Sequence, residues 1–328
     1  MSLEPSAEHP RPRAYAARVF TDRVMQALAA RYDLGVNAAD QPMDAHALAA
    51  AAAGCAYLLV SVTEQVDASV FEALAPDLKV VATLSVGVDH IDLEAARRHG
   101  VAVVYTPDVL SVACGELAWL LILSAARRGH EANAMVRSGE WPGWAPTQLL
   151  GRGLAGRRLG ILGLGRIGRE VAARASGFAM EVHYHNRRRL DPALESGAIF
   201  HETAESLLEA SDILCLCAPG GGDAAGFLTR ERIAHLPQGA VVVNVSRGDL
   251  VDDDALIEAL QTGRLFAAGL DVFRGEPAID PRYRTLPNVF LTPHIGSATV
   301  ETRDGMGFML LDGIAAIERG ETPENRII

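Results

Sequence analysis

Arg247, Glu276 and His294 are the residues whose types and spacing could carry out chemistry in this sequence. Each lies just past the end of an apolar run that is typical of a β-strand, and open α/β sheets bind their ligands at that edge. An arginine fork can hold a carboxylate through two parallel hydrogen bonds, and a histidine can move a proton near neutral pH. A neighbouring carboxylate favours the charged histidine and orients its ring. Any one of the three alone has an ordinary structural explanation, so it is their joint placement that points to a proton-transfer site.

A glycine pattern in the middle of the chain predicts a dinucleotide site. The apolar run 159–162 leads directly into Gly163, Gly165 and Gly168, and an amphipathic stretch follows. In such a strand–turn–helix unit the first glycine permits the tight turn and the second lets the backbone approach a pyrophosphate. The third lets the helix pack closely on the strand. A second apolar run, 180–185, follows at the distance expected of this unit.

The end of that second run predicts which dinucleotide is preferred. An NAD-selective fold places an acid there, but this chain has Asn186 followed by Arg187 and Arg188. Because an acid repels a 2′-phosphate and arginines bind it, we expect NADP(H) to be preferred, with NAD(H) possible. The alternative is a solvated basic turn. His183 and His185 share one face of the run and lack a third ligand nearby, so we expect packing and coenzyme contacts there and no metal.

The composition is that of an ordinary α/β protein of 328 residues, long enough for two domains. A formal net charge of −11 argues against a general binder of nucleic acid or of anionic membranes. The four cysteines lack the spacing of a disulfide framework or a zinc site, and Cys215 and Cys217 are expected as buried thiols on one strand. The first thirteen residues are polar and proline-rich, and the longest apolar run, 117–126, is too short to span a bilayer. We therefore expect no signal peptide and a cytoplasmic protein.

Short apolar runs alternate with helical patterns along the chain, which predicts parallel sheets with crossover helices. The first series has strands expected at 15–20, 57–62, 78–84 and 101–105, and helices at 22–31, 44–53, 68–74 and 93–98. The second series begins at the glycine pattern and has later strands expected at 199–200, 213–218, 240–245, 267–272 and 289–292.

Three further segments organise the chain. The helix expected at 109–128 has so broad an apolar face that it must be covered on more than one side, as at a domain or subunit junction. An arm with proline and tryptophan follows at 139–156. The last helix, 300–319, has too little partner structure of its own and is expected to pack on the N-terminal domain. The resulting fold class is α/β, with two doubly wound parallel-sheet domains.

Five segments, in this order, give the chain a resemblance to a known family. They are 85–90 (Ser-Val-Gly-Val-Asp-His), 163–168, 243–251, 269–277 and 292–299. From about residue 14 onward the sequence resembles the D-isomer-specific 2-hydroxyacid dehydrogenases. The resemblance implies a flavodoxin-like substrate domain formed by 1–107 and 297–328, with a Rossmann dinucleotide-binding domain, 108–296, inserted into it. It also implies a homodimer through the dinucleotide-binding domains.

The resemblance assigns a role to each candidate catalytic residue. Arg247 would bind the carboxylate of a 2-keto acid, and His294 would protonate the keto oxygen as hydride arrives from the nicotinamide. Glu276 would keep His294 protonated and correctly turned. The backbone N–H groups of Val86 and Gly87 would complete the carboxylate site. The coenzyme site would be lined by the glycine turn and by strand-end residues, namely Gly163, Gly165, Arg166, Ile167, Gly168, Asn186, Arg187, Arg188, Cys217, Ala218, Pro219, Val245, Ser246, Asp271 and Gly296, with Asp271 on the nicotinamide amide.

Within the family, the chain looks most like NADPH-dependent glyoxylate/hydroxypyruvate reductases. Its 85–90 segment is similar to their substrate loop, and Trp144 resembles a residue that reaches the active site of the partner subunit. Arg303, with Ser297 close by, resembles a contact to the polar end of the substrate. Plain packing at a dimer interface is the alternative for the tryptophan.

Several alternatives stay open at this point. Reductases of 2-ketogluconate and of hydroxyphenylpyruvate share much of the pattern, and some relatives are dinucleotide-sensing corepressors that keep the same three residues. Phosphoglycerate dehydrogenase is disfavoured because the acid for NAD is missing. Formate dehydrogenase is disfavoured because Glu276 stands where that branch has an amide.

Overall fold

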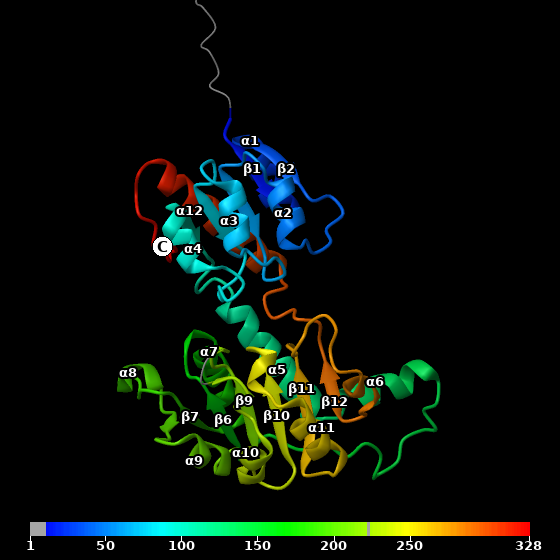
Figure 1. Ribbon diagram of the computed structural model, residues 1–328. Coiled ribbons are helices and arrows are strands. Elements are labelled where there is room, and N and C mark those ends of the chain that lie inside the picture. Colours follow the sequence, from blue (N-terminus) through cyan, green and yellow to red (C-terminus); the bar gives the residue numbers. More distant parts are fainter. Residues whose placement is uncertain (1–10, 222–223) are drawn as a thin grey trace, which may run out of the picture. The chain divides into compact units, whose positions relative to one another are not determined.

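The computed structural model describes residues 11–221 and 224–328 and divides the chain into two compact units (Figure 1). The first unit is Met1–Leu110 together with Ala298–Ile328, and the second unit is Ser111–Ser297. These divisions fall close to the predicted domain boundaries at 107/108 and 296/297. The residues 1–10, which include most of the polar start where no signal peptide is expected, lie outside the described residues.

The first unit is built on a five-stranded parallel sheet in the order β2-β1-β3-β4-β5. This is the flavodoxin-like order that the resemblance implied. Its elements are β1 (Arg13–Ala16), α1 (Asp22–Arg31), β2 (Asp33–Val36), α2 (Ala45–Ala51), β3 (Tyr57–Val60), α3 (Ala68–Leu74), β4 (Val80–Thr83), α4 (Leu93–His99), β5 (Ala102–Val104) and α12 (Val300–Glu318).

Both faces of this sheet are buried, as expected for parallel strands covered by crossover helices. Every residue of β3 and β4 is buried. One face packs on α2, α3 and α4, and the other packs on α1 and α12 through Leu28, Leu310 and Ile314. The expectation that the last helix packs on the N-terminal part of the chain is therefore confirmed.

The second unit is built on a seven-stranded parallel sheet in the order β12-β11-β10-β9-β6-β7-β8. Counted from β6, this is the Rossmann order 3-2-1-4-5-6 with one added strand. Its elements are α5 (Ser111–Ala126), α6 (Gly129–Ser138), β6 (Arg158–Leu162), α7 (Arg166–Ala175), β7 (Glu181–His185), α8 (Pro192–Glu195), β8 (Ile199–Phe200), α9 (Ala204–Glu209), β9 (Ile213–Leu216), α10 (Arg230–His235), β10 (Ala240–Asn244), α11 (Asp253–Gln261), β11 (Leu265–Leu270) and β12 (Val289–Leu291).

Helix α5 is covered on several sides, as its broad apolar face predicted. It contacts α6, α7, β10 and β11 of the second unit. Trp119 donates a hydrogen bond from Nε1 to the carbonyl oxygen of Val171 on α7 at 3.0 Å and stacks on Phe178 with ring centroids 4.4 Å apart. A Cβ on Gly115 would lie 2.7 Å from the Cβ of Glu170, so only glycine permits this close approach of α5 and α7.

The first strand was predicted at the wrong place. The sequence pattern favoured 15–20, but β1 is Arg13–Ala16. Pairing with β2 and β3 fixes this register, since Ala14 lies opposite both Leu34 and Tyr57. Phe20 is buried, but it packs on the core from the loop that precedes α1. The apolar pattern of the sequence indicates that Phe20 is buried, but it does not distinguish a buried loop residue from a strand residue.

In residues 11–221 and 224–328, no helix combines the length and the apolar character that a membrane span requires.

Candidate functional site

The glycine turn between β6 and α7 has the geometry that a dinucleotide requires. Gly163 has a φ of +93°, and a Cβ there would lie 2.6 Å from the backbone nitrogen of Ala218. A Cβ on Gly168 would lie 2.3 Å from the carbonyl oxygen of Gly163. Gly165 differs, because a Cβ there would meet no atom within 4 Å. The turn is therefore tight against the segment that follows β9, and it leaves free space at Gly165, directly before the N-terminus of α7, where the N–H groups of the first helical turn can bind an anion.

Asn186 fastens the end of β7 to this turn. Its Oδ1 accepts a hydrogen bond from the backbone N–H of Leu164 at 2.7 Å. The side chains of Arg187 and Arg188 follow and are exposed. The basic turn therefore has two exposed cations, Arg187 and Arg188, next to the neutral amide of Asn186, whose oxygen is already hydrogen-bonded to the glycine turn.

The third arginine of this run, Arg189, has a different function. It forms a bidentate pair with Glu195, with Nε at 2.7 Å from Oε1 and Nη2 at 3.1 Å from Oε2. The hydroxyl of Tyr184 donates to the same carboxylate at 2.5 Å. These bonds from Arg189 and Tyr184 lower the pKa of Glu195 to about 2. Arg189 thus neutralises a carboxylate that would otherwise repel an anion at this turn.

His183 also has its polar atoms occupied. Its Nδ1 lies 2.9 Å from Nε2 of His201, and its Nε2 lies 2.6 Å from Oε1 of Glu181. His185 directs Nδ1 to the carbonyl oxygen of His201 at 2.8 Å. Both predicted histidines therefore belong to a hydrogen-bond network of β7 and the segment after β8.

Glu276 and His294 meet as the sequence predicted. Oε2 of Glu276 lies 2.7 Å from Nδ1 of His294, and Oε1 accepts the backbone N–H of Phe273 at 2.6 Å. Burial acts to raise the pKa of Glu276, but the hydrogen bond to His294 and the electrostatic interaction with it act to lower the pKa. The Phe273 N–H and the charge of Arg247 add to this effect, and the net pKa is lowered. Glu276 is therefore held as a carboxylate against the imidazole.

The loop that carries His294 is held in place by Asp271. His294 has a φ of +54°, in the left-handed region that costs a non-glycine residue energy, and its N–H bonds the carbonyl oxygen of Asp271 at 2.8 Å. The buried carboxylate of Asp271 accepts from Thr292 Oγ1 at 2.6 Å and from the N–H groups of Ile295 and Gly296 at 2.8 and 2.9 Å. Asp271 therefore orders the loop; its contact with a nicotinamide amide stays a prediction.

Arg247 lies at the carboxyl end of β10, where it is half-buried. Its backbone carbonyl accepts from Nδ2 of Asn244 at 2.8 Å, and its Nη1 donates to the carbonyl oxygen of Ser246 at 2.9 Å. Its positive charge acts on Glu276. The arginine predicted from strand 240–245 thus lies in the electrostatic field of the Glu276–His294 pair.

The predicted residues after β9 border the same edge. A Cβ on Gly163 would also come within 2.9 Å of the carbonyl carbon of Cys217, so this strand end forms the floor of the glycine turn. Ser246 donates a short hydrogen bond to the carbonyl oxygen of Ala218, which joins the ends of β9 and β10. Cys215 and Cys217 are thiols with sulfur atoms 3.6 Å apart. Cys215 is buried as expected, but the prediction was wrong for Cys217, which follows the end of β9 and is only partly buried.

The first unit carries the predicted substrate loop just after β4. Ser85 is buried and donates to the carbonyl oxygen of Gly87 at 2.6 Å, and its Oγ lies 2.8 Å from Oγ1 of Thr83. Nε2 of His90 lies 2.8 Å from the same Thr83 oxygen. Within the described chain, the N–H groups of Val86 and Gly87 make no backbone hydrogen bond. The hydrogen bonds of Thr83, Ser85 and His90 therefore hold the loop in place, and the two backbone N–H groups of Val86 and Gly87 can donate to an anion.

The remaining predicted substrate contacts are distributed over both units. Ser297 ends the second unit, whereas Arg303 lies in the first turns of α12 in the first unit. Trp144 lies on the arm of the second unit and is 81% exposed.

Sequence reasoning missed Asn244 and Thr292, which hold Arg247 and Asp271 in position. Asn244 is 1% exposed inside an apolar strand, and such a buried polar residue is the signal that could have indicated a positioning role. The roles of Glu195 and Tyr184 had no such signal, because the bonds to Arg189 appear only once the chain is folded.

The fold and this site define a class of protein, an enzyme that transfers hydride with a nicotinamide coenzyme. Comparison with known proteins agrees. The family model for the NAD binding domain of D-isomer specific 2-hydroxyacid dehydrogenases matches residues 119–296. A glycerate dehydrogenase from Hyphomicrobium methylovorum is 42% identical over 265 residues, which are 80% of this chain and 82% of the relative.

Solved structures give the same result over nearly the whole chain. A D-isomer specific 2-hydroxyacid dehydrogenase from Polaromonas sp. JS6 66 is 58% identical with a TM-score of 0.95, covering 97% of this chain and 100% of that chain. An NADPH-dependent glyoxylate/hydroxypyruvate reductase from Sinorhizobium meliloti, in complex with NADP and malonate, is 31% identical with a TM-score of 0.86, covering 97% of each chain.

The chain belongs to the D-isomer specific 2-hydroxyacid dehydrogenase family and is an NAD(P)-dependent 2-hydroxyacid dehydrogenase. The predictions of the family, the fold class and the enzyme class are thereby confirmed.

Proposed function

We propose that the protein reduces a small 2-keto acid of the glyoxylate or hydroxypyruvate type to the D-2-hydroxy acid, with NADPH as the coenzyme and His294 as the proton donor. The observation that carries the proposal is the 2.7 Å contact between Glu276 and His294, with the charge of Arg247 acting on the same pair. The relatives named for glycerate, glyoxylate and hydroxypyruvate support the substrate class.

The arrangement of this chain's side chains supports a simple sequence of events. Arg247 binds the substrate carboxylate and orients the keto group. Because Nδ1 of His294 is engaged by Glu276, Nε2 is the nitrogen that faces the substrate and donates the proton to the keto oxygen. That oxygen gains negative charge in the transition state, where Arg247 and the protonated imidazole stabilise it. The reduced nicotinamide, when bound, supplies the hydride to the keto carbon.

The residues present fit the coenzyme. The open position of Gly165 and the N–H groups at the start of α7 suit a pyrophosphate. Arg187 and Arg188 suit a 2′-phosphate, since Arg189 already neutralises Glu195 and Asn186 adds no negative charge. We assign the other coenzyme contacts to the strand-end residues predicted from the sequence.

The proposal extends to the substrate loop and to assembly. We assign the N–H groups of Val86 and Gly87 to the substrate carboxylate, and we assign Ser297 and Arg303 to the polar end of the substrate.

We also propose a homodimer, because Val136, Trp141, Trp144 and Leu150 are all more than half exposed on α6 and the arm. Sedimentation at micromolar concentration tests this, and a monomer would contradict it.

A turnover assay tests the function. The pure protein is mixed with NADPH and a panel of 2-keto acids, and the loss of NADPH absorbance is followed. We expect turnover with glyoxylate or hydroxypyruvate. Highest catalytic efficiency with 2-ketogluconate or hydroxyphenylpyruvate would assign the protein to those branches, and binding of NADPH without turnover of any keto acid would favour a dinucleotide sensor.

The role of Arg247 is tested separately. Arg247→Ala should nearly abolish turnover while the dissociation constant for NADPH changes little, because the guanidinium binds substrate and not coenzyme. A large loss of NADPH affinity with intact turnover at saturation would contradict the assignment.

A further inference from the structure

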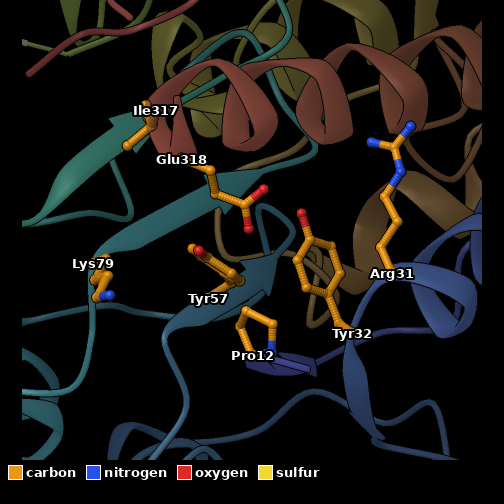
Figure 2. A pocket seen from close by; sticks show the side chains of 7 residues that line it. All are labelled: Pro12, Arg31, Tyr32, Tyr57, Lys79, Ile317 and Glu318. Carbon is orange, nitrogen blue, oxygen red and sulfur yellow. The ribbon is translucent and has the colours of Figure 1, made fainter. Parts of the chain in front are cut away.

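An open cavity of about 630 Å³ lies in the first unit at the edge of the sheet opposite to the substrate loop (Figure 2). We call it the Tyr32 pocket; it is lined by Pro12, Arg31, Tyr32, Tyr57, Lys79, Ile317 and Glu318. The lining residues precede or begin β1, β3 and β4, or end α1 and α12. The substrate loop follows the other end of β4, so the Tyr32 pocket is not part of the proposed catalytic site.

Two buried tyrosines form the inner wall of the Tyr32 pocket. Tyr32 is 3% exposed and Tyr57 is 4% exposed, and their rings meet edge to face with centroids 5.1 Å apart. The hydroxyl of Tyr32 is buried and makes no hydrogen bond of regular geometry with any group of the described chain. The carboxylate of Glu318 acts on this hydroxyl, but a buried hydroxyl without a well-oriented partner costs free energy, so a ligand that bonds it with regular geometry would gain what the free protein lacks.

Charged groups surround these hydroxyls. Figure 2 shows the carboxylate of Glu318 between the two phenol groups, with Arg31 and Lys79 on opposite sides. Burial, the charge of Glu318 and a hydrogen-bonding interaction with its carboxylate raise the pKa of Tyr32 to about 12 against the charge of Arg31, so this phenol is neutral at physiological pH. Burial and the same carboxylate also raise the pKa of Tyr57. Within the described part of the chain, neither Arg31 nor Lys79 forms an ion pair, nor does Glu318.

The charges of Glu318, Arg31 and Lys79 indicate which charged groups a ligand of the Tyr32 pocket should carry. Glu318 is the last residue of α12, and α1 ends at Arg31, so the partial negative charges of two helix C-termini add to the carboxylate. That region suits an ammonium group. Two cations against one carboxylate leave one positive charge in excess, which suits a ligand whose own net charge is negative.

We propose that the Tyr32 pocket binds a dicarboxylic α-amino acid. The ammonium group of the ligand lies at Glu318 and the phenol oxygens, and its two carboxylates lie toward Arg31 and Lys79. A ligand with one ammonium and two carboxylates neutralises the excess charge and supplies a well-oriented partner for the Tyr32 hydroxyl. The cavity volume is within the range of small-molecule sites. This site is an addition to the proposed catalytic function and does not depend on it.

The first experiment measures binding of L-glutamate to the full chain by titration calorimetry. Glutarate, which lacks the ammonium group, and L-glutamine, which lacks the second carboxylate, are the matched ligands. We expect one molecule of L-glutamate per chain and weaker binding of each matched ligand, by about five-fold or more per missing charge. Because a carboxylate could also enter the proposed catalytic site, the titration is repeated with Arg247→Ala, and the affinity should persist.

The second experiment uses variants of the pocket. Glu318→Gln should weaken L-glutamate by about five-fold, whereas Asp312→Asn, an exposed carboxylate on the same helix, should leave the affinity unchanged. Tyr32→Phe should weaken binding by about three-fold or more and should leave the ligand-free protein equally or more stable, because its hydroxyl makes no hydrogen bond of regular geometry there. A hydroxyl with only a structural role would instead destabilise the free protein when removed. Turnover of the keto acid by Glu318→Gln should match that of the unaltered protein.

Three results would overturn the proposal. One is the absence of L-glutamate binding at millimolar concentration. Another is loss of that binding in Arg247→Ala, which would place the ligand at the catalytic site. The third is an equal effect of Glu318→Gln and Asp312→Asn. Since the readout is binding and not turnover, each of these results leaves the test of the reductase function independent.

Discussion

Replacing two glycines of the glycine turn between β6 and α7 by alanine should separate folding from coenzyme binding. A Cβ on Gly163 would lie 2.6 Å from the nitrogen and 2.7 Å from the Cα of Ala218, and its φ is +93°. A Cβ on Gly165 would meet no atom within 4 Å, and its φ is −80°. The first position is therefore limited by the protein itself, and the second only by what binds there.

The magnitudes follow from these contacts. In Gly163→Ala the unfavourable φ costs about 1–3 kcal/mol and the contact with the segment after β9 costs about as much again, so the free energy of unfolding should fall by roughly 2–6 kcal/mol. Gly165→Ala should change it by less than about 1 kcal/mol, in the stabilising direction. Its added methyl group should displace a phosphate from the N–H groups of α7 and weaken NADPH by about ten-fold or more.

Urea unfolding followed by tryptophan fluorescence measures the first effect. All three tryptophans lie in the second unit, and Trp119 packs next to α7, so the signal reports this unit. Coenzyme titration measures the second effect. Gly177→Ala, where a Cβ also meets no atom within 4 Å, is the control and should change neither quantity appreciably. Unaltered NADPH affinity in Gly165→Ala would refute the assignment of this turn to the pyrophosphate.

Three further predictions concern the basic turn and the sheet. Arg187→Ala should narrow the preference for NADPH over NADH by roughly ten-fold or more through loss of one charge-assisted contact, and an unchanged ratio of kcat/KM values would show that the phosphate is bound elsewhere. Asn186→Asp keeps an acceptor for the Leu164 N–H and adds a negative charge, so the same ratio should shift toward NADH; a shift toward NADPH would contradict this. Asp212 ties the starts of β6 and β9 together through Arg158, and although burial acts to raise its pKa, these bonds lower it. Asp212→Asn should therefore cost about 1 kcal/mol of unfolding free energy at neutral pH, and the difference from the unaltered protein should vanish as the pH falls below the lowered pKa; a difference independent of pH in urea titrations would exclude the ion pair as its cause.

The fold class and the elements around the candidate catalytic residues follow from the sequence alone. Strand-like runs that alternate with helical patterns define a parallel sheet, and a residue placed directly after such a run must lie at its carboxyl edge. This is why Arg247, Glu276 and His294 could be predicted to share one edge. The glycine pattern was equally informative, because the backbone contacts of Gly163 and Gly168 exclude any side chain.

The way in which these residues are held became visible only in the folded chain. The buried carboxylate of Asp271 accepts hydrogen bonds from the loop that carries His294. Arg189 forms an ion pair with Glu195, whereas the neighbouring Arg187 and Arg188 are exposed, so arginines next to each other in the sequence differ in role. Likewise, the Tyr32 pocket joins residues from α1, β3 and the end of α12 that no local pattern connects. Local sequence patterns reflect the propensity of a segment for helix or strand and the burial of its residues, whereas the hydrogen-bond partner of a polar group depends on how distant segments pack together.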